Sequence, residues 1–127
     1  MANVRLDQNG VPMGPSYSPD GIGTVHRAGV TAVDAGDPTD TSGAVDCAGF
    51  QECRFDLIIT GTGFVSLEVA ALFWNPRQSK WFAGASRVFT ATGQHAISVD
   101  ARGGVVYLKV TAFSGTSFSL SADYVLS

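Results

Sequence analysis

The chain has 127 residues and a net charge of −3, with 45% hydrophobic and 15% charged residues. This length suits one domain, and the composition is too apolar and too weakly charged for an intrinsically disordered chain. The mild acidity, without a basic cluster, argues against nucleic-acid binding. The sequence contains no run of about 18 apolar residues, so no membrane-spanning helix is predicted. Many glycines and few glutamates and lysines favour strands and turns over helices.

Residues 1–20 are predicted to form an extended N-terminal arm, and residues 21–127 a single domain. Pro12, Pro15 and Pro19 oppose any helix or central strand in the arm. Spaced apolar side chains in the arm are candidates for binding a partner: Leu6, Val11, Met13 and Tyr17. Because the arm has no period with which to bury them in a helix or hairpin of its own, we predict that it lies on a partner surface. The alternative is a floppy terminus.

Residues 21–34 predict one or two strands with weak alternation, and residues 35–43 predict a loop rich in turn residues. Three carboxylates lie in or beside this loop, those of Asp34, Asp37 and Asp40. A loop with several carboxylates could bind Ca²⁺. Aspartate is also a common turn residue, and the spacing is not that of an EF-hand. We therefore expect a solvated turn and no metal.

From residue 44 onward, apolar side chains alternate with a period of two, which indicates strands that bury one face. The expected inward faces lie within 55–59, 65–73, 97–101, 106–112 and 118–126. Two short strands are expected at 80–82 and 87–90, and Gly103-Gly104 is expected at the centre of a hairpin turn. Seven or eight short strands without a helical period predict an all-β fold, an antiparallel, jelly-roll-like β-sandwich.

The outward positions of these strands are more apolar than the surface of a monomer needs. They include Ile58, Ala70, Leu72 and Val125. Such patches often mark subunit contacts. Trp74 and Trp81 flank the turn at residues 75–79, so these two residues and Leu72 are candidates for a subunit or ligand contact. An exposed tryptophan can stack on a sugar ring; alternatively, each covers an end of the sandwich or packs on a neighbouring subunit.

Few residues offer chemistry. His26 and His95 have no cysteine or second histidine within four residues, and no serine lies in a Gly-x-Ser-x-Gly motif. Cys47 and Cys53 are six positions apart and are candidates for a disulfide across a short loop, with free buried thiols as the alternative. We therefore expect no enzymatic activity and no cofactor.

Several motifs of the body resemble a pattern in small structural proteins of tailed bacteriophages. A strand ends in Gly61-Thr62-Gly63, the next strand leads to Trp74-Asn75-Pro76 and Lys80-Trp81-Phe82, and the chain finishes with a hairpin of residues 105–112 and 117–126. The pattern resembles that of head decoration, or cement, proteins, and it covers residues 44–127. This resemblance implies a β-sandwich or jelly-roll body, often trimeric, that sits on an assembled capsid and locks neighbouring capsomers.

The expected function is therefore that of a non-enzymatic virion protein, a capsid decoration protein that forms homotrimers and binds the major capsid protein. The N-terminus lacks the apolar stretch of a signal peptide, so we expect synthesis in the host cytoplasm and a final place on the capsid surface. The alternative is a carbohydrate- or receptor-binding module of a phage tail or of a secreted enzyme. Arg or Asp groups beside an exposed tryptophan in a concave site would favour this alternative.

Overall fold

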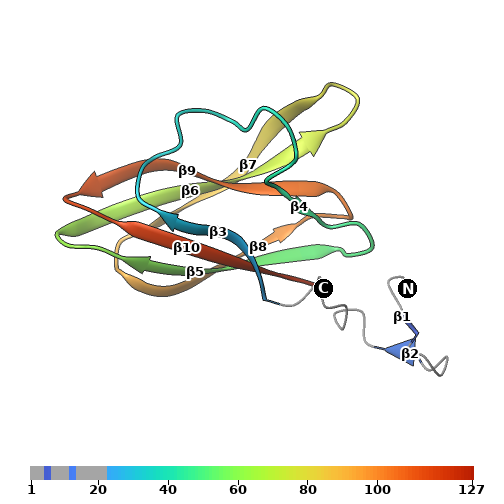
Figure 1. Cartoon of the computed structure of the whole chain (residues 1–127), viewed down its shortest axis with the longest axis horizontal. Coiled ribbons are helices and arrows are strands. Elements are labelled where there is room, and N and C mark those ends of the chain that lie inside the picture. Colours follow the sequence, from blue (N-terminus) through green and yellow to red (C-terminus); the bar gives the residue numbers. More distant parts are fainter. Residues whose placement is uncertain (1–4, 7–11, 14–22) are drawn as a thin grey trace.

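The computed structural model describes residues 5–6, 12–13 and 23–127, which form strands and loops (Figure 1). The strands of the body are β3 Thr24–Val30, β4 Val45–Asp46, β5 Glu52–Thr60, β6 Phe64–Asn75, β7 Lys80–Phe89, β8 Gly93–Asp100, β9 Val105–Gly115 and β10 Ser119–Leu126. The described part of the chain contains no helix of the length and apolarity needed to cross a membrane.

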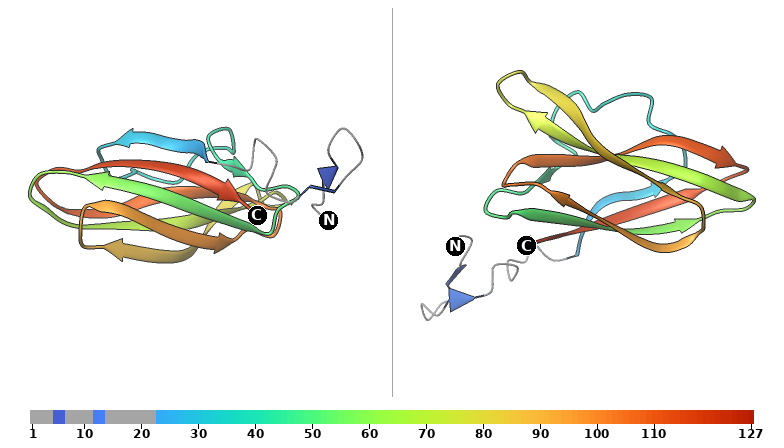
Figure 2. Two further views of the ribbon diagram at one scale, coloured as in Figure 1. Left: turned by 90° about the horizontal axis from the view of Figure 1, so that it is seen from below. Right: turned by 180° about the vertical axis from the view of Figure 1, so that it is seen from behind.

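The eight strands of the body form two antiparallel four-stranded sheets that face each other (Figure 2). Sheet I has the order β3-β10-β5-β8, and sheet II has the order β4-β9-β6-β7. The chain changes sheet at every step except the hairpin from β6 to β7, so it crosses between the layers repeatedly. This is the connectivity of a jelly roll, and the predicted all-β antiparallel sandwich is confirmed.

The core lies between the two sheets, where alternate side chains of the central strands meet. Phe55 and Leu57 of sheet I and Leu67 and Leu108 of sheet II are at most 1% exposed. The predicted inward faces at 55–59, 97–101 and 118–126 are confirmed in their main residues, as is the inward face of β9 as far as Val110.

Register shifts displace the ends of two predicted faces. Val65 is 57% exposed and Ala112 is exposed, although both were expected to point inward. The ladder between β6 and β9 shifts register between Phe64 and Ser66 and again between Glu68 and Val69. A β-bulge adds a residue to one strand and turns the following side chains to the other face.

One strand and one turn differ from the predicted pattern, and the structure explains the glycines of a second turn. Residues 80–82 and 87–89 belong to one continuous strand, β7, rather than to two, and Thr90 lies just beyond its end. The β8–β9 turn is centred on Arg102 and Gly103, both with positive φ, one residue earlier than expected. At the Gly-Thr-Gly turn, a methyl group on Gly61 would lie 2.2 Å from the carbonyl oxygen of Ser117, so the β5–β6 turn packs closely on the β9–β10 turn.

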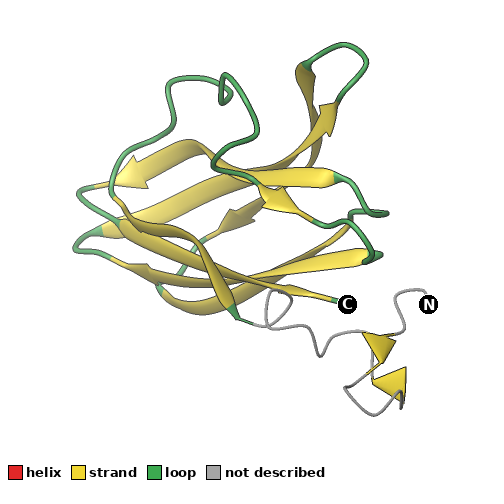
Figure 3. Ribbon diagram, turned by 45° about the vertical axis from the view of Figure 1, so that its right-hand side comes forward, coloured by secondary structure: helices red, strands yellow, loops and turns green. Residues whose placement is uncertain are grey.

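The expected exposure of Ala70 and Leu72 on the outer face of sheet II is wrong. These residues are 5% and 2% exposed. The connection from β3 to β4, residues 31–44, which we name the cover loop, lies against this face (Figure 3). The N–H of Asp34 donates to the carbonyl of Val110 at 3.0 Å, and Asp37 pairs with Lys109 at 2.8 Å. The chain itself therefore shields a face that the sequence pattern assigned to solvent or to a subunit.

The N-terminal arm is described at two short strands, β1 Arg5–Leu6 and β2 Pro12–Met13. They pair with each other, with Arg5 opposite Met13 and Leu6 opposite Pro12, and they form a separate two-stranded ladder. The arm was expected to form no helix or hairpin of its own, and this expectation is wrong at these four residues, which pair as two antiparallel strands. Val11 and Tyr17 lie outside the described residues, and the binding of the arm to a partner stays a prediction.

Candidate functional site

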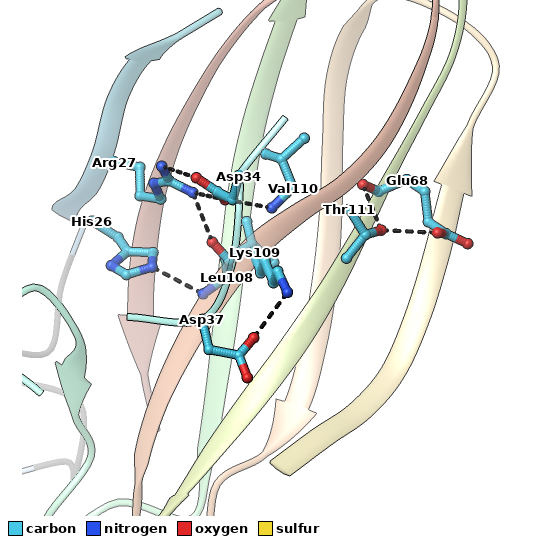
Figure 4. Close-up of polar contacts among 9 residues, drawn as sticks. All are labelled: His26, Arg27, Asp34, Asp37, Glu68, Leu108, Lys109, Val110 and Thr111. Carbon is cyan, nitrogen blue, oxygen red and sulfur yellow. Dashed lines mark hydrogen bonds and ion pairs between the residues drawn. The ribbon is translucent and has the colours of Figure 1, made fainter. Parts of the chain in front are cut away.

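A polar seam joins the edge of sheet I to the edge of sheet II. β4 pairs only with Val105 and Val106, so the rest of that edge of β9 needs other partners. The Leu108 N–H donates to Nε2 of His26 at 3.0 Å, and Arg27 Nη1 donates to the Leu108 carbonyl at 3.2 Å (Figure 4). Asp34 accepts from the Val110 N–H at 2.8 Å. These three side chains thus form the hydrogen bonds with the edge of β9 that a neighbouring strand would otherwise form.

The charges in this seam stabilise one another. Arg27 and Asp34 form a two-pronged ion pair, with N–O distances of 2.5 and 2.9 Å and side chains 16% and 17% exposed. Burial opposes ionisation of Asp34, but its hydrogen bond to Arg27 is among the interactions that hold its pKa below the ordinary value. Burial, and then the charge of Arg27, lowers the pKa of His26 from 6.5 to about 4. His26 is therefore a neutral acceptor at neutral pH.

The carboxylates of the cover loop serve separate partners instead of one cation. Asp34 binds Arg27, Asp37 binds Lys109, and Asp40 accepts from the N–H and hydroxyl of Ser42 at 3.0 and 2.7 Å. Within residues 23–127, no three His, Cys, Asp or Glu side chains are grouped to hold a metal ion. The loop aspartates act as structural groups of the turn and of the contact with sheet II.

Trp74 and Trp81 line a cavity of about 240 Å³ between the cover loop and the β6–β7 hairpin, here named the aromatic cavity. Its other walls come from residues 37–39 of the loop and residues 79–80 of the hairpin. The hairpin is shaped by Asn75, whose Oδ1 accepts from the N–H groups of Arg77 and Gln78 at 3.0 and 3.1 Å. Asx turns of this kind fix the chain locally.

The two indoles differ in exposure and in partners. Their ring centroids lie 5.2 Å apart in an edge-to-face arrangement, and Trp81 also lies 6.0 Å from the ring of Tyr107. Trp81 is 9% exposed, whereas Trp74 is half-buried. The Nε1–H of Trp81 is the one buried side-chain polar group of the described residues without a hydrogen-bond partner. The structure therefore brings the two predicted tryptophans together, while Leu72 is buried.

The outer face of sheet I carries a second hollow, of about 430 Å³, beside Ile58 and Ala96. Ile58 is 54% exposed and stands opposite Gln94 on one side and Ser121 on the other. The expected exposure of Ile58 is confirmed.

The edge of sheet II at β7 is open. Eight of the ten residues of β7 are exposed, and sheet II ends at this strand. Phe82 and Val88 are 46% and 54% exposed. The strand has no proline and only two charged residues, Lys80 and Arg87, so it lacks most of the devices that protect an edge from pairing.

Cys47 and Cys53 are fully buried and are free thiols in the structure. A hydrogen bond with the Cys47 thiol, together with burial, raises the pKa of Cys53. The two sulfurs therefore lie beside each other, and the disulfide stays a prediction. Of the histidines, His26 belongs to the polar seam and His95 contacts the Ala91 carbonyl at 2.8 Å.

Comparisons with family models, with curated proteins and with solved structures returned no match. The resemblance to phage decoration proteins is accordingly carried by the motifs of the sequence alone.

The polar seam was not predicted from the sequence. Residues 21–34 alternate only weakly, and the roles of His26, Arg27 and Asp34 depend on an edge of β9 that lies about 80 residues further along the chain. The available signal was an Arg and an Asp, seven residues apart, at the two ends of a short apolar segment with few other charges. That pattern indicates an ion pair but not the strand edge that the pair covers.

Proposed function

We propose that the protein is a non-enzymatic structural protein of a tailed-phage virion, which decorates the assembled capsid as a homotrimer and stabilises contacts between capsomers. One observation carries the association of copies, the open edge of β7. A long exposed edge strand offers unpaired N–H and C=O groups to another chain. Phe82 and Val88 add apolar area beside those groups, with exposures of 46% and 54%. A second copy of the chain is the occupant that we propose for this edge.

The trimeric state and the capsid as a target rest on the resemblance of the body to decoration proteins. The Gly-Thr-Gly turn and the aromatic hairpin, which carry that resemblance, are both well-formed surface features of the sandwich. Closed symmetric association would cover each copy's edge with a neighbour, which removes the risk of open-ended pairing. The proposed place of action is the virion surface after synthesis in the host cytoplasm, with the major capsid protein as partner.

The mass of the native protein tests the association. Light scattering at micromolar concentration is expected to give three times the chain mass of 13.2 kDa. Val88→Lys places a charge on the open edge and is expected to yield the monomer. Val25→Lys is the matched control, because Val25 is similarly exposed, at 62%, but lies on sheet I. A monomeric wild type, or a Val88→Lys variant that keeps the oligomer, would contradict the use of this edge.

Binding to heads tests the capsid role separately. Phage heads that lack the protein are mixed with it and sedimented, and the bound fraction is measured. Deleting residues 1–20 is expected to leave the sandwich folded but to weaken binding at least about tenfold, or about 1.4 kcal/mol. If the full chain does not sediment with heads, the decoration role is wrong; if the truncated chain binds as tightly, the role of the arm is wrong.

A further inference from the structure

We infer that the aromatic cavity is a binding site for a neutral pyranose, either a free sugar or one residue of a surface glycan. This inference does not depend on the proposed capsid role. Lys80 and Trp81 belong to β7, but they line the cavity beside the cover loop, whereas association is proposed through the open backbone edge of β7 beside Phe82 and Val88. The cavity is closed on one side by the cover loop and on the other by the β6–β7 hairpin, so two segments far apart in the chain build it.

The size and lining of the cavity favour a single ring. Pockets for drug-sized ligands measure about 300–1,000 Å³, so a cavity of about 240 Å³ suits a smaller molecule. Trp74 offers a half-buried aromatic surface, on which the apolar C–H face of a pyranose can stack. The polar groups around it are the Asp37 carboxylate, the Lys80 ammonium and the hydroxyls of Thr39 and Ser79. Such a mixture of acceptors and donors matches a ring with several hydroxyl groups.

The Asp37 carboxylate is already positioned for this task. Its Oδ1 accepts from Lys109 at 2.8 Å, while its side chain remains 46% exposed. A carboxylate held from one side by a lysine can accept sugar hydroxyl protons from the other side. The lining carries one acidic and one basic side chain, Asp37 and Lys80, and therefore no net charge, which is why the inference commits to a neutral sugar.

The buried indole N–H of Trp81 is the second, independent observation. A buried donor without a partner is rare in folded proteins and needs an explanation. Trp81 lines the cavity. Among the residues that the structure describes, its Nε1–H is the only buried side-chain polar group without a hydrogen-bond partner. The Nε1 atom has almost no accessible surface, so a sugar hydroxyl oxygen would supply the missing acceptor once the ring displaces the side chains that cover this donor.

The test is a titration of the full ¹⁵N-labelled chain with the methyl glycosides of glucose, mannose, galactose and N-acetylglucosamine. The chain has two tryptophans and therefore two indole N–H resonances, which Trp74→Phe assigns. At least one glycoside, at millimolar concentration, is expected to shift the Trp81 indole resonance. Methyl glucuronide serves as the acidic comparison and is expected to bind more weakly.

Variants locate the site. Trp81→Phe keeps an aromatic ring but removes the N–H, and it is expected to weaken binding about tenfold. Asp37→Ala removes the carboxylate from an exposed position, so it tests the site even if Trp81→Phe fails to fold. Arg77→Ala is the control, because Arg77 lies in the same hairpin turn but does not line the cavity, and it is expected to leave affinity unchanged.

Three results would overturn the inference. No glycoside shifts the Trp81 resonance; or binding persists at full strength in both Trp81→Phe and Asp37→Ala; or only the glucuronide binds. Each leaves the mass of the native protein and its sedimentation with heads unaffected, so a failure here is distinguishable from a failure of the proposed capsid role.

Discussion

The outer faces of the two sheets were expected to be alike, but they are built differently. On sheet I, Ile58 is 54% exposed at the centre of the face, and its neighbours along β5 alternate between buried and exposed. On sheet II, Leu72 takes a comparable outward place on β6 but is 2% exposed, because the cover loop lies against that sheet. Alternation identifies faces only where one face meets solvent, and it cannot tell a free face from one covered by a distant loop.

The largest loss of stability is expected from a substitution in the core between the two sheets. Leu108 is fully buried between them, so Leu108→Ala should lower the free energy of unfolding by about 2–5 kcal/mol by leaving a cavity. Lys109→Ala, one position along, removes only an ion pair with the half-exposed Asp37 and should cost less than about 1 kcal/mol. Urea unfolding of both variants measures the difference. A larger loss for Lys109→Ala than for Leu108→Ala would mean that Lys109, and not Leu108, faces the core.

The polar seam, which ties the two sheets at their edges, should make the protein sensitive to acid. In the folded state the pKa of His26 is about 4, against 6.5 in the unfolded chain, so between these values the unfolded state binds more protons. Stability present above pH 6.5 is therefore lost as the pH falls through this window, by on the order of 3 kcal/mol at pH 4.

Unfolding of the wild type and of His26→Gln, measured across this pH range, tests the assignment. Glutamine can still accept a hydrogen bond from the Leu108 N–H, but it does not titrate. The variant should therefore lose less stability than the wild type between pH 6.5 and 4. Parallel pH profiles would show that His26 does not carry this acid sensitivity.

A smaller effect separates the two outer faces directly. Leu72→Ala should cost about 2 kcal/mol, at the low end for a buried leucine because the cover loop can move into the space. Ile58→Ala, on the open face of sheet I, should change stability by less than about 0.5 kcal/mol. Thermal unfolding of the two variants is sufficient to compare them. Equal losses would mean that the outer faces of the two sheets are equally covered.

How much of the fold could be predicted from the sequence differs along the chain. The inward faces at residues 55–59 of β5 and 97–99 of β8 were predictable because their period of two is uninterrupted there. The burial of Val69, Ala70, Ala71 and Leu72 in succession was not, because it depends on a register shift and on the cover loop. Those features arise from contacts between segments far apart in the chain, which no local pattern contains.

The candidate site divides in the same way. The pair of tryptophans was predictable, because both flank a turn marked by Asn75 and Pro76. That Asp37 would join them, and that Trp81 would be covered, followed from the path of the cover loop across sheet II. The open edge of β7 was also hidden, since two short strands were expected where one long strand forms.

The central claim is that β7 is the edge at which copies of the chain meet, and amide hydrogen exchange along β7 tests it most directly. Alternate N–H groups of this strand point away from β6 and are free in a single chain. At concentrations that support the oligomer, these amides are expected to exchange slowly, and dilution should release them together. Equally fast exchange in β7 at every concentration, while the amides of β5 and β6 stay protected, would contradict association through this edge.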